Sequence, residues 1–309
     1  MQKPHTDVHD RAHDHDRGLA HDLMVMSGLI ERRRALKWFA GAGTAALVAG
    51  CGGSDASVAA TSEASAAAAT PTPTPTPTAT STATGASTVS GCVADPTETN
   101  GPYPADGTNV SSGLTSNALT VSGIVRGDIR SSFMGTSTAI AAGVPLTLTL
   151  TVVNVNSSCV PLAGYAVYVW HCNARGQYSL YDLPSESYLR GVGVTDANGQ
   201  VTFTTIVPGC YDGRYPHIHF EVFSSLATAT GGRYAALISQ LAIPAAMCSA
   251  VYADTATYAN GATNFARVSI SSDNVFGDNS SAQIAQQTPA FSGSVAAGYT
   301  ANAVIGLAR

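Results

Sequence analysis

Lysine is nearly absent from this chain of 309 residues, and beyond Lys37 it does not occur at all. The basic residues that follow Cys51 are all arginines, spaced singly along the sequence, and only 11% of the chain is charged. Nucleic acids are bound by basic stripes, so the lack of one excludes nucleic acid as a partner. With 45% hydrophobic residues, the chain is neither a disordered acidic tail nor a coiled coil.

The N-terminal region has no apolar run long enough to cross a bilayer, since its apolar stretch extends only from Phe39 to Gly50. The arginines 32–34 ahead of this stretch resemble a twin-arginine export signal. Residues 47–51 resemble a lipoprotein processing box, in which Cys51 is lipidated. We therefore expect residues 1–50 to be an export leader and the folded protein to be held outside the cytoplasm by a membrane lipid. The alternative is an uncleaved membrane-seeking helix.

Residues 51–90 contain little except Ala, Ser, Thr, Pro and Gly, so they cannot form a core. Alternating Thr and Pro favours an extended chain, which predicts a spacer behind the lipidated Cys51. The body that follows is long enough for one large domain. We assign residues 91–276 to that domain and residues 277–309 to a C-terminal extension with a closing strand over 301–307.

Helical periodicity is also missing, because no segment after Cys51 keeps a 3.6-residue repeat for more than about two turns. Residues 146–151 instead alternate Leu with Thr, which is the period of a strand with one apolar face. Residues 192–195 and 200–206 flank Asn198-Gly199, a pair that predicts a hairpin. The pattern predicts an all-β sandwich with long loops and little helix.

The cysteines show no CxxC spacing, which disfavours a cysteine metal site. Five cysteines follow Cys51, and outside the cytoplasm an odd number allows two disulfides and one free thiol. We expect a Cys92–Cys159 disulfide first. A Cys210–Cys248 disulfide is the second expectation, with Cys172 left free.

The His217-Ile218-His219 sequence lies in a segment that alternates like a strand. Alternate side chains of a strand point to the same face, so the two imidazoles are placed to hold one ion. Taken alone, such a pair is equally compatible with two surface or core histidines. Tyr211, which follows the Pro208-Gly209 turn, can fold back towards the same ion.

A further tyrosine, Tyr178, follows a strand that ends near Trp170 and a turn at Gly176. Here the chain resembles the intradiol ring-cleavage dioxygenases, the catechol and protocatechuate dioxygenase group, over roughly residues 92–276. Their metal site combines a Tyr in Trp-x-x-x-x-x-Gly-x-Tyr, a Tyr in Pro-Gly-x-Tyr, and a His-x-His pair with an Arg just ahead. The resemblance implies that the metal ligands are Tyr178, Tyr211, His217 and His219.

The same resemblance implies one Fe(III) per chain, O2 as co-substrate and a small aromatic diol as substrate. A buried phenol ionises at neutral pH only beside a strong Lewis acid, which suits ferric iron. The family cleaves the ring between the two hydroxyl-bearing carbons and forms a cis,cis-muconate. The resemblance further implies that Tyr211 leaves the iron when the substrate binds and that Arg214 stabilises negative charge on the ring. It also implies that Gln240 forms a hydrogen bond to an intermediate oxygen and that Tyr103 covers the ring.

Other interpretations of the sequence remain. Residues 161–164 and the turn over 196–199 also resemble transthyretin-like sandwiches, which bind without catalysis. A structural stalk would explain the spacer alone, and extradiol cleavage would need Fe(II) with two His and a carboxylate. An anchored enzyme suggests diols met outside the cell, such as lignin-derived or polyphenolic compounds. The sequence carries no signal of the oligomeric state.

Overall fold

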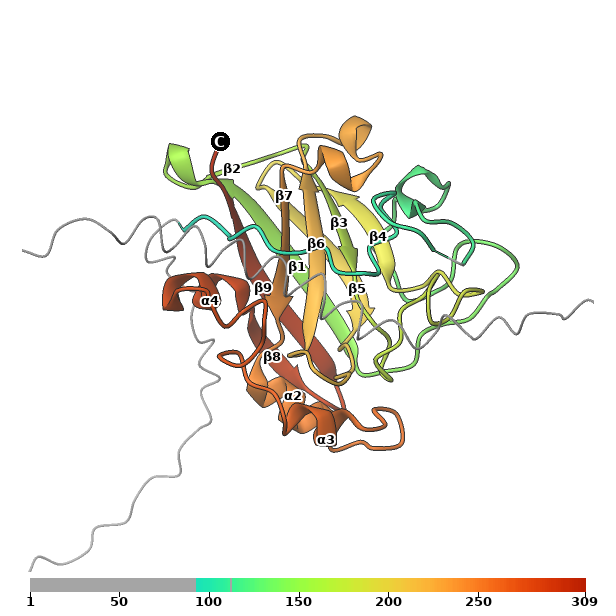
Figure 1. Cartoon of the computed structure of the whole chain (residues 1–309). Coiled ribbons are helices and arrows are strands. Elements are labelled where there is room, and N and C mark those ends of the chain that lie inside the picture. Colours follow the sequence, from blue (N-terminus) through green and yellow to red (C-terminus); the bar gives the residue numbers. More distant parts are fainter. Residues whose placement is uncertain (1–92, 112) are drawn as a thin grey trace, which may run out of the picture. The chain divides into compact units, whose positions relative to one another are not determined.

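The structure, a computed structural model, describes residues 93–111 and 113–309 (Figure 1). The leader expected over 1–50, the lipidated Cys51, the spacer over 51–90 and Cys92 lie outside these residues. Within the described ranges, no helix has both the length and the apolar character needed to cross a membrane.

Strands dominate the described part of the chain, and its helices are short. The strands are β1 (Pro145–Asn154), β2 (Val160–Pro161), β3 (Ala166–Trp170), β4 (Arg190–Val194), β5 (Gln200–Ile206), β6 (His217–Phe223), β7 (Leu237–Ala242), β8 (Ala290–Ser294) and β9 (Gly298–Leu307). The α-helices are α2 (Ala245–Val251), α3 (Gly261–Phe265) and α4 (Ser281–Gln287). Single 3-10 turns lie at Ala118–Thr120, Val155–Ser157, Leu226–Thr228 and Gly232–Tyr234.

The first sheet is built around β1, which pairs with β9 in parallel and with β2 and β5 in antiparallel orientation; β8 adds to the outer side of β9. The Leu–Thr alternation of β1 explains its position. Leu146, Leu148 and Leu150 are buried, while the threonines between them are only half-buried. One face of this sheet therefore supplies the core, as the period of two predicts.

The second sheet has the order β4-β3-β6-β7, with every pair antiparallel. All residues of β3 and β6 are buried, because both faces of this sheet are covered. Val167 and Val169 of β3 and Phe220 and Val222 of β6 join the leucines of β1 in one apolar cluster. The opposite face carries the histidines of β6. The predicted all-β sandwich is confirmed.

The structure differs from two expectations, namely the hairpin at residues 198–199 and the domain boundary after residue 276. The turn at Asn198-Gly199 forms, with Asp196 and Gln200 hydrogen-bonded across it, but it does not close a hairpin. Strand β4 pairs with β3 in one sheet and β5 pairs with β1 in the other, so the turn links the two sheets. The expected domain boundary after residue 276 also shifts, because β9 lies between β1 and β8 inside the first sheet.

The predicted disulfide between Cys210 and Cys248 is wrong, since both thiols are free and buried. The Cys210 sulfur lies near the carbonyl oxygens of residues 211 and 214, and the Cys248 sulfur near the carbonyl of Ile243. Each thiol thus contacts its own local backbone rather than the other sulfur. Cys172 is free, as expected, and Cys159 is disulfide-bonded. Its expected partner, Cys92, lies outside the described residues.

Candidate metal centre

The two histidines open strand β6, and their alternate positions place both rings on the face away from the inter-sheet core. Both are buried, and their Nε2 atoms lie 3.1 Å apart. The Nδ1 of His217 donates to the carbonyl oxygen of Tyr215 at 2.6 Å, which leaves the Nε2 lone pair facing its neighbours. The ring of His219 stacks on Trp170 with 4.8 Å between centroids.

The two tyrosines come from separate loops and meet at the same atom. The hydroxyl of Tyr178 lies 3.4 Å from the Nε2 of His217, and that of Tyr211 lies 3.2 Å from it. A glycine turn allows this approach. Gly176 has a φ of +80°, and a Cβ there would stand 2.8 Å from the Cβ of Tyr211. The structure therefore brings together all four side chains that the sequence singled out.

Burial favours the uncharged form of each of these groups. It lowers the pKa of His217 to about 3, with the charge of Arg214 as the next cause, and holds the pKa of His219 well below its ordinary value. Burial also raises the pKa of both Tyr178 and Tyr211. Neutral imidazoles are the form that binds metals, and only a cation of high charge would ionise the two phenols here.

The donor set fits a metal ion. Three polar atoms surround the Nε2 of His217 within 3.4 Å, although its lone pair can accept one good hydrogen bond. An ion between them would satisfy all of them at once. The described residues contain no group of three or more His, Cys, Asp or Glu placed to hold a metal. The phenols are thus essential members of the set, and two imidazoles with two phenolates suit Fe(III).

Sequence comparisons agree with this geometry. A family model described as Dioxygenase matches residues 126–245. The chain is 38% identical over 76 residues to the protocatechuate 3,4-dioxygenase beta chain of Burkholderia cepacia, covering 20% of this chain and 32% of that protein. It is 34% identical over 88 residues to catechol 1,2-dioxygenase 1 of Acinetobacter lwoffii, covering 22% of this chain and 28% of that protein. The matches thus span about a third of each relative's length.

The fold points the same way. An intradiol ring-cleavage dioxygenase from Tetranychus urticae superposes with a TM-score of 0.52 at 23% identity, over 70% of this chain and 95% of that one. The chain thus resembles the intradiol ring-cleavage dioxygenases in fold and, over residues 126–245, in sequence. The residues that this resemblance singled out beyond the four candidate ligands have the following places in the structure.

Arg214 lies beside the four candidate ligands, since its charge influences the pKa of each of them, and its guanidinium binds two other side chains. Its Nε donates to Asp273 at 2.9 Å, and its NH2 group donates to Gln240 at 2.8 Å. The Gln240 amide also donates to the carbonyl oxygen of Thr99 at 2.8 Å. Both ends of this amide are thus engaged. Gln240 links Arg214 to Thr99, and its expected bond to an intermediate oxygen stays a prediction.

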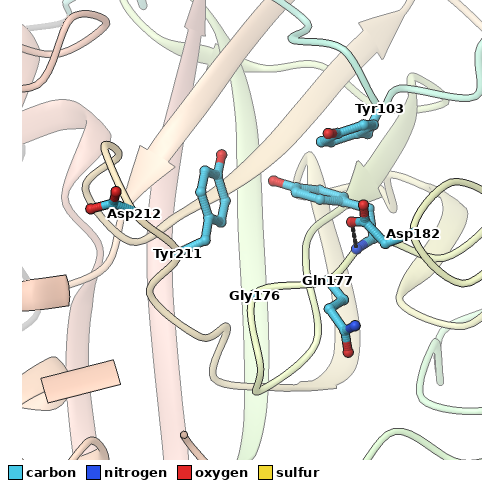
Figure 2. A pocket seen from close by; sticks show the side chains of 7 residues that line it. Tyr103, Gly176, Gln177, Asp182, Tyr211 and Asp212 are labelled. Atoms are coloured by element: carbon cyan, nitrogen blue, oxygen red, sulfur yellow. Dashed lines mark hydrogen bonds between the residues drawn. The ribbon is translucent and has the colours of Figure 1, made fainter. Parts of the chain in front are cut away.

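The first described residues, 93–103, run across the second sheet (Figure 1), and the backbone N–H of Glu98 donates to the carbonyl oxygen of Ile238 in β7. Gly101 lies against His219, since a Cβ there would be 3.2 Å from the imidazole. Tyr103 stacks on Tyr178 with 4.8 Å between ring centroids. A pocket of about 300 Å³ opens beside these rings (Figure 2), and its lining comprises Tyr103, Gly176, Gln177, Tyr178, Asp182, Tyr211 and Asp212.

Sequence reasoning missed two carboxylates at the centre. Asp273 is buried and comes from the loop before α4, 59 residues from Arg214. Asp182 lines the pocket and accepts the backbone N–H of Tyr178 at 2.8 Å. The position of Asp182, four residues after Tyr178, was a usable local signal. No local pattern could have linked Asp273 to Arg214.

Proposed function

We propose that this protein is a non-haem Fe(III) intradiol dioxygenase that cleaves catechol-type diols with O2. One observation carries the proposal, namely the convergence of two phenols and two neutral imidazoles on one point beside an open pocket. Tyr178, Tyr211, His217 and His219 would hold the iron. The transthyretin-like alternative finds no support in the comparisons, and it leaves these four side chains without a role.

The proposed reaction balances without an external reductant. The carbon–carbon bond between the two hydroxyl-bearing carbons breaks, the O–O bond breaks, and both oxygen atoms enter the product. The diol and O2 together become a cis,cis-muconate-type dicarboxylic acid. Bound ferric iron would supply Lewis acidity, which withdraws electron density from the deprotonated diol and exposes its ring to O2.

The chain's own residues would divide the remaining tasks. Tyr178 is 2% exposed and packed between Tyr103 and Tyr211, so it is the fixed phenol. Tyr211 is half-buried at the pocket, which makes its Oη the group that can swing away and accept a substrate proton. Arg214 would stabilise negative charge on the substrate, with its guanidinium held by Asp273.

The direct test loads the purified chain with ferric iron and records its visible spectrum and its product from catechol. Tyrosinate bound to Fe(III) gives a burgundy colour, and intradiol cleavage gives a muconate. Extradiol cleavage would instead give a yellow semialdehyde. A colourless protein that takes up no iron would refute the proposal and favour a binding module.

A single hydroxyl tests the ligand set. Tyr178→Phe removes one phenolate, so we expect the visible band to bleach or shift strongly and activity to fall at least a hundredfold. Tyr234→Phe is the matched control, because Tyr234 is half-exposed and its hydroxyl contacts only Arg233 among the described side chains. An unchanged spectrum in Tyr178→Phe would remove this residue from the ligand set.

We also propose that the protein is exported folded and anchored by a lipid on Cys51. The supporting features are the arginines at 32–34 and the Leu47–Cys51 sequence. Cys51→Ser is expected to release the protein from the membrane fraction into the soluble extracytoplasmic fraction. Intact mass of the mature N-terminus provides the second measurement, and an unlipidated Cys51 in the wild-type protein would contradict the proposal.

A further inference from the structure

The lining of the pocket carries charge of one sign only. Its titratable members besides the tyrosines are Asp182 and Asp212, and the described lining contains no Arg or His. Gln177 adds a neutral amide. An anionic substituent on a substrate would therefore interact less favourably with this lining than a neutral or cationic substituent.

The positions of Asp182 and Asp212 relative to the tyrosine hydroxyls indicate which end of a bound substrate would lie near each carboxylate. The hydroxyls of Tyr178 and Tyr211 point inward to His217, at 3.4 and 3.2 Å. Asp182 lies at the other end of the first tyrosine, where it accepts that residue's backbone N–H, and Asp212 follows the second tyrosine in sequence. Figure 2 shows the two acids on opposite sides of the pocket.

A diol bound with its two oxygens at the inner end must direct its ring substituents toward the outer end. Its substituents then enter the region beside Asp182. Because Asp182 is exposed to solvent, its charge is screened and its effect on a nearby charge is moderate, on the order of a few-fold to tenfold in affinity.

We propose, on the basis of the proposed function, that Asp182 is a specificity-determining residue that selects against ring substituents of negative charge. The substrates are then catechols whose side chain is neutral or cationic, and diols that carry a carboxylate on the ring are disfavoured. Asp212 contributes less, because its side chain is 62% exposed and lies 3.9 Å from the guanidinium of Arg267.

The experiment compares three diols of similar size on the iron-loaded enzyme, namely 4-methylcatechol, 3,4-dihydroxybenzoate and 3,4-dihydroxybenzylamine. We expect kcat/KM to follow the order amine, methyl, carboxylate, with the carboxylate at least about tenfold below the amine. The ratio should shrink at high ionic strength, since the discrimination is electrostatic. A pocket that discriminates by shape alone would give a ratio that salt does not change.

Two matched variants locate the effect. Asp182→Asn keeps an acceptor for the backbone N–H of Tyr178 and removes the charge, so the amine-to-carboxylate ratio should fall about three- to tenfold. Asp212→Asn should change it by less than about twofold. Dissociation constants of the same three compounds, measured in the absence of O2, report binding independently of turnover.

The outcomes separate this inference from the function on which it rests. If 4-methylcatechol is cleaved but Asp182→Asn leaves the ratio unchanged, the specificity inference is wrong and the dioxygenase proposal stands. If the iron-loaded enzyme cleaves none of the three diols, the dioxygenase proposal itself fails. A wild-type preference for the carboxylate would also overturn the inference.

Discussion

The two ends of strand β6 bury acidic groups in opposite ways. At the end that begins with His217, Asp273 accepts hydrogen bonds from the guanidinium of Arg214 and from the backbone N–H of Tyr215. At the other end, Glu221 is fully buried with no hydrogen-bond donor for either oxygen among the described residues. The first carboxylate has a buried cation beside it, and the second pairs with no cation in the described part of the chain.

The two carboxyl groups, Asp273 and Glu221, differ in the direction in which their pKa is shifted. Burial alone would raise the pKa of Asp273, but Arg214 and the N–H donors hold it below the ordinary value. Burial raises the pKa of Glu221 well above the ordinary value, and the neighbouring Asp106 raises it further. The protein thus places a full ion pair beside the proposed metal and an uncharged acid farther along the same strand.

The largest effect is expected where the ion pair is broken. Asp273→Ala leaves Arg214 buried without its counter-ion, which should cost about 3–5 kcal/mol of unfolding free energy. We also expect kcat/KM to fall more than tenfold, because the guanidinium loses its anchor. Denaturant unfolding and steady-state kinetics measure the two effects. Asp273→Asn, which keeps an acceptor, should lose less of both, and equal losses would contradict this account.

A buried acid away from β6 sharpens the comparison. Asp95 accepts the backbone N–H of Gly306 at 2.7 Å, and it forms no ion pair with any described residue. Burial raises its pKa from 3.8 to about 7. Since the folded state holds the proton more tightly, the stabilising contribution is fully present below about pH 4 and is lost as the pH rises through 7.

Replacing Asp95 by Asn should therefore stabilise the protein above pH 7, by up to about 4 kcal/mol, and do little near pH 4. Thermal or denaturant unfolding across pH 4–8 measures this. The variant keeps the acceptor for Gly306, so packing should not change. If the wild type and Asp95→Asn show parallel pH profiles, the carboxyl is not the group that titrates.

The smallest effect is expected at the uncharged acid. Glu221→Gln conserves shape and can donate an amide hydrogen to Asp106, so the unfolding free energy should change by less than about 1 kcal/mol. Denaturant unfolding near neutral pH provides the measurement. A loss of several kcal/mol, similar to that of Asp273→Ala, would show that Glu221 is ionised and paired, and the contrast between the two ends of β6 would disappear.

Much of the centre was readable from local sequence. The alternation of β6 predicts that His217 and His219 share a face, and the Pro208-Gly209 turn allows Tyr211 to fold back towards them. Tyr178 was assigned to the same centre only through the family resemblance. The Leu–Thr repeat of β1 predicts its buried face. These features depend on residues within one element, and the period of a strand determines them.

Other features were not readable in this way. The turn at Asn198-Gly199 looks the same whether it closes a hairpin or links two sheets, because the choice depends on which strands lie beside β4 and β5. The predicted Cys210–Cys248 disulfide is wrong for a related reason. Burial in one core does not bring two sulfur atoms into bonding geometry.

The sequence by itself determined the strand periods, the apolar faces, the His-x-His pair and the chemical kinds of donor available for a metal. Only the tertiary structure decided that Asp273 neutralises Arg214, that residues 99–103 lie over His219, and that Asp182 meets the outer end of the pocket. Side-chain direction within a strand follows from backbone geometry over a few residues. Contacts between distant segments follow from how the sheets pack, which no short window of sequence contains.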